Sequence, residues 1–256
     1  MVIDAHAHLA DRSRSESWEE NDRKLVDAAD KLGIDQLCCS LLTPRPGKPE
    51  EFIQGNRWAR EAMDRYPGRI LPYCYVNSGY GKVTLDEVRY CVEDLGFIGV
   101  KLYNEYFINE PVLWPLVELC IELGVPILEH AGHSHYYVKE QPRMSGAEHV
   151  ADLANRYPEA MIICGHIGGG GDWEWAIKAL RSAPTAYADT SGSVVDEGMI
   201  EMAVEVLGAD RLLFACDMSM TAGVGKIRGA RITDEHKRKI LGENMQGILA
   251  KRGEAQ

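Results

Sequence analysis

The sequence predicts an α/β protein built as one (β/α)8 TIM barrel, with no separate cap domain. Three observations support this prediction. The 256 residues are the usual size for such a barrel. Eight short β-rich runs alternate with eight segments of helical periodicity. The first run ends in two histidines, whereas the alternative, an open nucleotide-binding sheet, needs a glycine turn there.

The first four strand–helix pairs follow from apolar runs and the signals that end them. Strands are expected at 2–8, 36–42, 69–76 and 97–103, with helices at about 18–32, 49–66, 84–94 and 111–123. Leu32-Gly33 and Leu123-Gly124 put glycine just past a periodic run, where a left-handed helix end costs least. Pro67 ends the second helix.

The second half of the chain repeats the pattern. Strands are expected at 125–130, 160–166, 185–189 and 211–216, with helices at about 145–157, 172–182, 196–207 and 233–251. The alternation implies parallel βαβ units, so residues 1–256 form one domain. The segments 132–144 and 218–231 are expected to be loops, and they are the stretches long enough to cover a site.

Composition limits the function classes. A net charge of −11 disfavours nucleic acid as a partner. The basic residues between Lys226 and Lys239 alternate with acids and glycine, which favours a solvated helix face. The apolar runs are too short to span a membrane, and the N-terminus has no secretory leader pattern. Seven cysteines without CxxC spacing indicate free thiols in a reducing cytoplasm, with no metal or nucleophilic role.

The first strand ends in a pair of histidines. In Asp4-Ala5-His6-Ala7-His8 the period of two puts both histidines on one face, which we expect to point into the barrel. Ala5 and Ala7 are then expected against the outer helices. Asp4 shares the inward face one layer deeper, where it can orient a ligand histidine.

Three further strands end in residues that can bind metal. The fifth expected strand ends in His130, the sixth in His166, and the eighth is followed by Asp217. Barrel active sites form at the carboxyl ends of the strands, so these side chains are expected to meet there. Histidines and a carboxylate at one barrel mouth suit Zn²⁺ or another divalent first-row metal.

These motifs, taken together, resemble the amidohydrolase superfamily and, within it, the amidohydrolase-2 branch. The resemblance spans essentially the whole chain. It rests on Asp4-x-His6-x-His8, Gly99-Val100-Lys101-Leu102-Tyr103, Val125-Pro126-Ile127-Leu128-Glu129-His130-Ala131-Gly132, Cys164-Gly165-His166-Ile167-Gly168-Gly169, Asp189-Thr190-Ser191-Gly192, Cys216-Asp217 and Ile240-Leu241-Gly242-Glu243-Asn244.

The resemblance implies a role for each matching residue. His6, His8 and His130 are similar to the family's histidine ligands, and Asp217 to its carboxylate ligand and proton-transfer group. His166 resembles the catalytic histidine that hydrogen-bonds the metal's water or polarises the substrate. One divalent metal is implied, Zn²⁺ first and Mn²⁺ as the alternative.

Two departures from the family pattern concern the substrate. Ala215-Cys216-Asp217-Met218-Ser219-Met220 differs from the family's usual loop after the last strand, so the substrate pocket is expected to differ. Lys101 ends the fourth strand, where binuclear relatives carry a carbamylated lysine; a single metal with an unmodified lysine is favoured here. Lys101, Tyr103, His133 and His135 are the candidate substrate contacts.

Three functions remain open from sequence. The preferred one is a hydrolase that uses a metal-activated water on an amide, lactone or ester of a small organic molecule. A lyase on the same site, a decarboxylase or hydratase of a carboxylic acid, is the alternative. It is less favoured because lyases of this branch carry an arginine for the substrate carboxylate, and no strand end offers one. A non-catalytic metal- or ligand-binding barrel is the third. A homodimer is expected from base rates.

Overall fold

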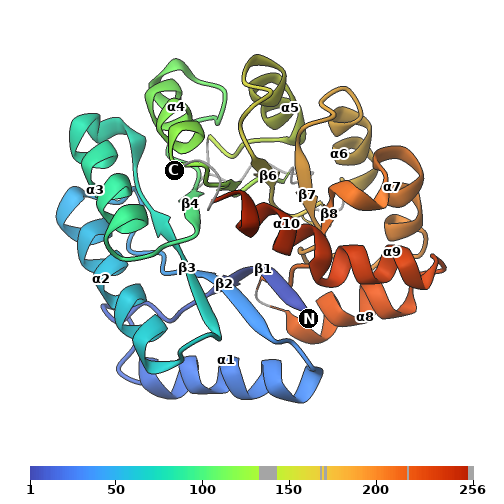
Figure 1. Cartoon of the computed structure of the whole chain (residues 1–256), viewed down its shortest axis with the longest axis horizontal. Coiled ribbons are helices and arrows are strands. Elements are labelled where there is room, and N and C mark those ends of the chain that lie inside the picture. Colours follow the sequence, from blue (N-terminus) through green and yellow to red (C-terminus); the bar gives the residue numbers. More distant parts are fainter. Residues whose placement is uncertain (133–142, 168, 170–171, 218, 253–256) are drawn as a thin grey trace.

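The computed structural model describes residues 1–132, 143–167, 169, 172–217 and 219–252. Eight strands form one sheet in the order of the sequence, all neighbouring pairs being parallel, and a ring of helices surrounds them (Figure 1). The strands are β1 (Ile3–His8), β2 (Gln36–Ser40), β3 (Ile70–Tyr75), β4 (Gly99–Leu102), β5 (Ile127–Glu129), β6 (Ile162–Cys164), β7 (Tyr187–Asp189) and β8 (Leu212–Leu213). The predicted (β/α)8 barrel is thereby confirmed.

Helices follow the strands in turn. They are α1 (Trp18–Leu32), α2 (Pro49–Arg65), α3 (Lys82–Glu93), α4 (Trp114–Glu122), α5 (Ala147–Arg156), α6 (Trp173–Leu180), α7 (Met199–Leu207), α8 (Met220–Gly229), α9 (Asp234–Arg238) and α10 (Asn244–Lys251). The segment 233–251, expected to be one helix, is divided by a π-helical turn at Lys239–Glu243. Within the described residues, no helix has the length and apolar character needed to cross a membrane.

Hydrogen bonds between the first and last strands close the barrel. The amide of Ala5 donates to the carbonyl of Phe214 at 2.9 Å, and the amide of Asp217 donates to the carbonyl of His6 at 2.7 Å. Ala7 and Asp217 form a parallel bridge. The closure therefore brings Asp217 beside the histidine pair of β1, although more than two hundred residues separate them in sequence.

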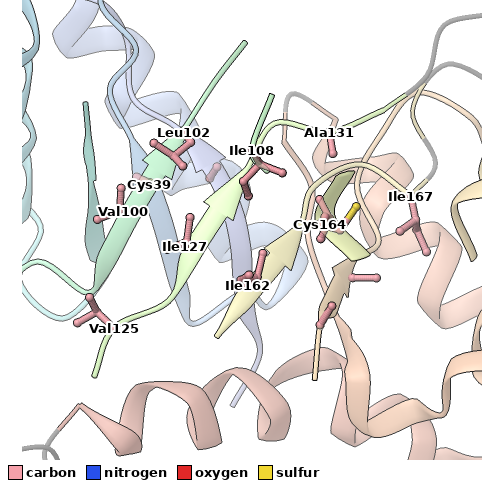
Figure 2. Packing of buried hydrophobic residues seen from close by; sticks show 14 of the residues in the cluster. Cys39, Val100, Leu102, Ile108, Val125, Ile127, Ala131, Ile162, Cys164 and Ile167 are labelled. Atoms are coloured by element: carbon pink, nitrogen blue, oxygen red, sulfur yellow. The ribbon is translucent and has the colours of Figure 1, made fainter. Parts of the chain in front are cut away.

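Two apolar layers hold the barrel. Residues inside it, among them Cys38, Tyr73, Leu128 and Leu213, pack on Met245 and Ile248 of α10, which lies across the barrel's amino-terminal end (Figure 1). The larger layer fills the space between strands and helices. Figure 2 shows part of it, with Val100 and Leu102 on β4 beside Ile127 on β5 and Ile162 on β6.

β1 departs from strict alternation. Its pairing with β2 shifts between Asp4 and Ala7, so that one extra residue is accommodated there, as in a β-bulge. The expectation that Ala5 packs against the outer helices was therefore wrong, because Ala5 belongs to the cluster inside the barrel. Ala7 belongs to the outer layer, as predicted. Beyond this shift, His6 and His8 lie on one face with Ala7 on the other, as the period of two predicts.

The prediction of a loop over 218–231 was wrong, because Met220–Gly229 form helix α8. Gly223, Gly225 and Gly229 lower the helix propensity of this segment and hide it from periodicity. Gly223 is required by packing, since a Cβ there would lie 2.8 Å from Sγ of Cys216 and 3.0 Å from the carbonyl oxygen of Ala215. α8 thus packs directly against the chain that leads into Asp217.

The prediction that Lys226 lies on a solvated helix face was also wrong. Its side chain is buried, and Nζ donates to the carbonyl oxygens of Thr190 at 3.2 Å and Gly192 at 2.7 Å. The lysine therefore fastens the segment after β7 to the helix that follows β8.

Alanine substitutions at two glycines of α8 test this packing. We expect Gly223→Ala to lower the free energy of unfolding by about 1–3 kcal/mol, because its Cβ meets Cys216 and Ala215. A Cβ at position 225 would have no atom within 4 Å, so Gly225→Ala should raise the free energy of unfolding by about 0.5–1 kcal/mol. Denaturant unfolding measures both, and equal effects would contradict the close approach of α8.

Candidate metal centre

The predicted ligands meet at the carboxyl ends of the strands. His6 and His8 end β1, His130 follows β5, and Asp217 follows β8. One ligand atom from each of His6, His8 and Asp217 lies within 4.8 Å of the other two. This donor set, two imidazoles and a carboxylate, is one that holds divalent first-row metals.

Hydrogen bonds orient the two histidines of β1. Nδ1 of His6 lies 2.8 Å from Oδ2 of Asp189, and Nδ1 of His8 lies 2.9 Å from Oγ of Ser40. Nε2 of His8 lies 3.0 Å from Oδ1 of Asp217. Partners on both Nδ1 atoms leave the two Nε2 atoms directed to the site, which is the usual arrangement behind metal-bound histidines.

Asp189 was missed as a functional residue, although its place at the end of the seventh predicted strand was a usable signal. It is fully buried and accepts four hydrogen bonds: from the amide of His166, from the amide and hydroxyl of Ser191, and from Nδ1 of His6. Burial alone raises the pKa of Asp189, but the bonds from His6 and Ser191 hold it well below the ordinary value.

This carboxylate has the role predicted for Asp4. Oδ1 of Asp4 instead accepts the amides of His6 and Cys216, each at 3.0 Å, and so secures the backbone where β1 meets the end of β8. Burial raises the pKa of Asp4 to about 7. The acceptor behind the ring of His6 comes from β7, across the barrel mouth.

A chain of hydrogen bonds fixes the proton positions on His166 and His130. The hydroxyl of Ser191 donates to Asp189 at 2.6 Å, so its oxygen accepts from Nδ1 of His166 at 2.9 Å. Nε2 of His166 then accepts from Nδ1 of His130, also at 2.9 Å. His130 consequently keeps a free lone pair on Nε2, as a metal ligand must, although it is not a member of the three-residue cluster.

The backbone at this mouth is strained where the chemistry is concentrated. His166 (φ 62°) and Asp217 (φ 54°) both adopt the left-handed conformation, which is uncommon for residues other than glycine. Gly165 precedes His166 because a Cβ there would lie 2.5 Å from the carbonyl oxygen of Glu129. The close approach of β5 and β6 places His130 and His166 in contact.

Lys101 lies at the base of the site. Its buried Nζ is 3.0 Å from Nε2 of His6, and burial lowers the pKa of Lys101 to about 8. Burial likewise lowers the pKa of His6 to about 3, so its ring is neutral and Nε2 accepts. The ammonium group therefore competes with a metal for the same lone pair.

A pocket of about 720 Å³ opens beside these residues. Its walls are formed by His8, Leu9, Ala10, Asp11, Asn21, Asp22, Lys24, Leu25, Ala28, Leu42, Arg45, Tyr103, His130, Asp217 and Met220. Tyr103, predicted to contact substrate, is stacked on His130 with ring centroids 4.0 Å apart. Of the other predicted contacts, His133 and His135 lie outside the described residues.

The pocket contains an arginine that strand ends did not reveal. Arg45 follows β2 in the loop before α2, and its guanidinium carbon lies 3.7 Å from the ring centroid of Tyr103. Sequence reasoning looked for arginine at strand ends, whereas this one reaches the site from within a loop. The cation thus shares a pocket with His8, His130 and Asp217.

Together, the barrel and its histidine–carboxylate mouth define the class of metal-dependent TIM-barrel enzymes. A family model described as amidohydrolase, that of the amidohydrolase-2 family, matches residues 3–244. The chain belongs to this family. No curated protein matches the sequence.

Solved structures share the fold at low identity. A dihydroxybenzoic acid decarboxylase from Polaromonas, with bound manganese and the inhibitor 2-nitroresorcinol, is 19% identical (TM-score 0.74; 97% of this chain and 96% of that chain covered). A 5-carboxyvanillate decarboxylase from Sphingomonas paucimobilis is 16% identical (0.76; 97% and 98%). A 4-oxalomesaconate hydratase from Rhodopseudomonas palustris is 18% identical (0.75; 100% and 97%).

The role of Asp189 can be tested with an isosteric change. Asp189→Asn removes the charge and replaces one acceptor by a donor; if the remaining oxygen keeps the amides of His166 and Ser191, Nδ1 of His6 loses its acceptor. We expect affinity for Mn²⁺ or Zn²⁺ to fall by about 10- to 100-fold, as measured by equilibrium dialysis. Asp210→Asn, at an exposed surface acid, is the control. Unchanged affinity in Asp189→Asn would mean that it orients no ligand.

Proposed function

We propose that this chain is a metal-dependent lyase that decarboxylates a small aromatic carboxylic acid without an oxidant. The observation that carries the proposal is Arg45, a guanidinium in the same pocket as His8, His130 and Asp217. A planar guanidinium is suited to paired hydrogen bonds with a carboxylate or a phenolate. The structural neighbours include two decarboxylases of aromatic acids and a hydratase, which supports the same class.

The proposed metal ligands are His6, His8 and Asp217, with His130 completing the set through its free Nε2. When bound, a divalent ion would act as a Lewis acid on oxygen atoms of the substrate. The manganese in the Polaromonas neighbour supports Mn²⁺ beside Zn²⁺ as the metal. In this proposal Lys101 is unmodified and the site holds a single ion, so the contact between Lys101 and His6 would be given up when the ion binds.

Arg45 and Tyr103 form the proposed acid-binding side. Tyr103 is stacked between His130 and the guanidinium of Arg45, so the position of the cation is fixed relative to the ligand histidine. An aromatic acid entering the pocket would put an anionic oxygen on Arg45 and the ring near Tyr103. Lys101 adds a second positive charge deeper in the mouth.

Asp217 is the proposed proton-transfer group. It is ionised, because the hydrogen bond from His8 and the nearby imidazoles outweigh the opposing effect of burial and lower its pKa. On binding, it would accept the proton of a ring hydroxyl and return it to the ring carbon that bears the carboxylate. The carbon–carbon bond to that group then breaks, CO2 leaves, and the electron pair restores the aromatic ring. His166 would act through His130, because its two ring nitrogens are bonded to Ser191 and His130.

Hydrolysis of an amide, lactone or ester on the same site is the second candidate. The family name and the pairing of a carboxylate with histidines favour it. It gives no specific use to Arg45, whereas an anionic acid does. The non-catalytic alternative is disfavoured because His6, His8, His130, His166 and Asp217 are all present and mutually oriented.

Metal analysis tests the centre itself. We expect about one equivalent of Mn²⁺ or Zn²⁺ in the purified protein and its loss in His6→Ala, with the fold retained by circular dichroism. Loss of metal should remove activity, and returning the ion should restore it only in the wild type. Two equivalents would point to a carbamylated Lys101, and full metal in His6→Ala would refute the ligand assignment.

The variant Arg45→Met distinguishes decarboxylation of an acid from hydrolysis of a neutral substrate. If the substrate is an acid, kcat/KM on hydroxybenzoic acids should fall by about 10- to 100-fold, since a charge-assisted hydrogen bond is lost. Turnover of neutral lactones and esters should change little. Arg14→Met, at an exposed side chain, is the matched control. A wild-type enzyme that turns over lactones or esters but no acid would favour the hydrolase.

A further inference from the structure

We propose that Asp22 of α1 accepts a hydrogen bond from a second polar group of the substrate, remote from its carboxylate. The substrate would then be an aromatic acid with a hydroxyl or amino group that points toward α1. This inference rests on the proposed function, because it assumes that the acid end lies at Arg45 and the metal ligands.

Asp22 is a buried acceptor with an unused oxygen. The residue is 2% exposed and lines the pocket. Oδ1 accepts the amide of Ala10 at 3.0 Å, and Oδ2 accepts no hydrogen bond from the described residues. A bound ligand would shield this oxygen from solvent, so a donor on the ligand would be a favourable partner for it.

The fold fixes Asp22 relative to the metal centre. Ala10 lies two residues beyond His8, so the bond to Asp22 ties the second turn of α1 to the end of β1. Arg45 comes from a different loop, after β2. A ligand held by Arg45 and His8 would therefore present another of its edges to α1.

Apolar side chains line part of the pocket, beside the polar residues Asp11, Asn21 and Lys24. They are Leu9, Ala10, Leu25, Ala28, Leu42 and Met220, and they offer contact surface to a ring. A volume of about 720 Å³ is within the range of pockets that hold drug-sized ligands, so there is room for a ring with several substituents.

The two arginines near Asp22 do not supply the missing donor. Burial raises the pKa of Asp22. The positive charges of Arg12 and Arg65 oppose this effect without a hydrogen bond to the carboxylate. The side chain of Arg12 instead bonds Glu61 and the carbonyl of Trp58, and Arg65 bonds Glu19. No hydrogen bond from either arginine to Oδ2 is found among the described residues, although Nε of Arg12 is buried without a partner.

The test compares 2-hydroxybenzoate with its 2,3-, 2,4- and 2,5-dihydroxy analogues in the metal-loaded protein, both by binding and by kcat/KM. At least one analogue should bind about tenfold or more tightly than the parent acid. Asp22→Asn keeps an oxygen for the amide of Ala10 and replaces Oδ2 by a donor, so it should lower affinity for the favoured analogue by more than it lowers affinity for 2-hydroxybenzoate. Asp27→Asn, at an exposed acid on the same helix, should keep the preference for that analogue.

Ala28→Phe provides an independent variant if Asp22→Asn does not fold. It narrows the pocket at α1 without touching the bond to Ala10, so the favoured dihydroxy acid should lose more affinity than the parent acid. Equal binding of all four acids by the wild type would overturn the role of Asp22 alone. Failure of every acid to bind would overturn the proposed function together with this inference.

Discussion

A single buried carboxylate, Asp189, organises the mouth of this barrel. It holds the ring of His6 directly and that of His166 through Ser191, and it bonds the amides of His166 and Ser191 as well. Since an ionised carboxylate only accepts hydrogen bonds, each of its partners must donate. The protons on three imidazoles are thereby fixed, including that of His130 at the end of the chain of bonds.

Several unusual backbone features accompany this arrangement. His166 and Asp217 adopt left-handed conformations, β1 has a bulge, and Gly165 and Gly223 allow approaches that a Cβ would block. Lys226 secures the segment after β7 from behind by bonding two of its carbonyl oxygens. The closely spaced strands and packed helices around these segments hold them in place, so the strained conformations persist.

The pocket has distinct chemical sides. Imidazoles and a carboxylate lie at the strand ends, a guanidinium stacked on a tyrosine lies beside them, and a buried aspartate lies on α1. Apolar side chains also line the pocket. Under the proposed function, such a pocket would bind a flat, anionic molecule with a further polar substituent, because the guanidinium and the aspartate on α1 would each have a partner.

Periodicity and motif placement in the sequence determined the barrel, the family and the residues at the ends of β1, β5, β6 and β8. These depend on local rules: the period of a strand, glycine at helix ends, and the meeting of parallel strand ends at one face. Other features needed tertiary structure. Asp189 behind His6, Arg45 reaching the site from a loop, the bulge in β1 and the glycine-rich helix α8 all follow from contacts between distant segments. The strand-end position of Asp189 can be read from the sequence, but its contact with His6, like the other three features, depends on what the closed barrel places opposite.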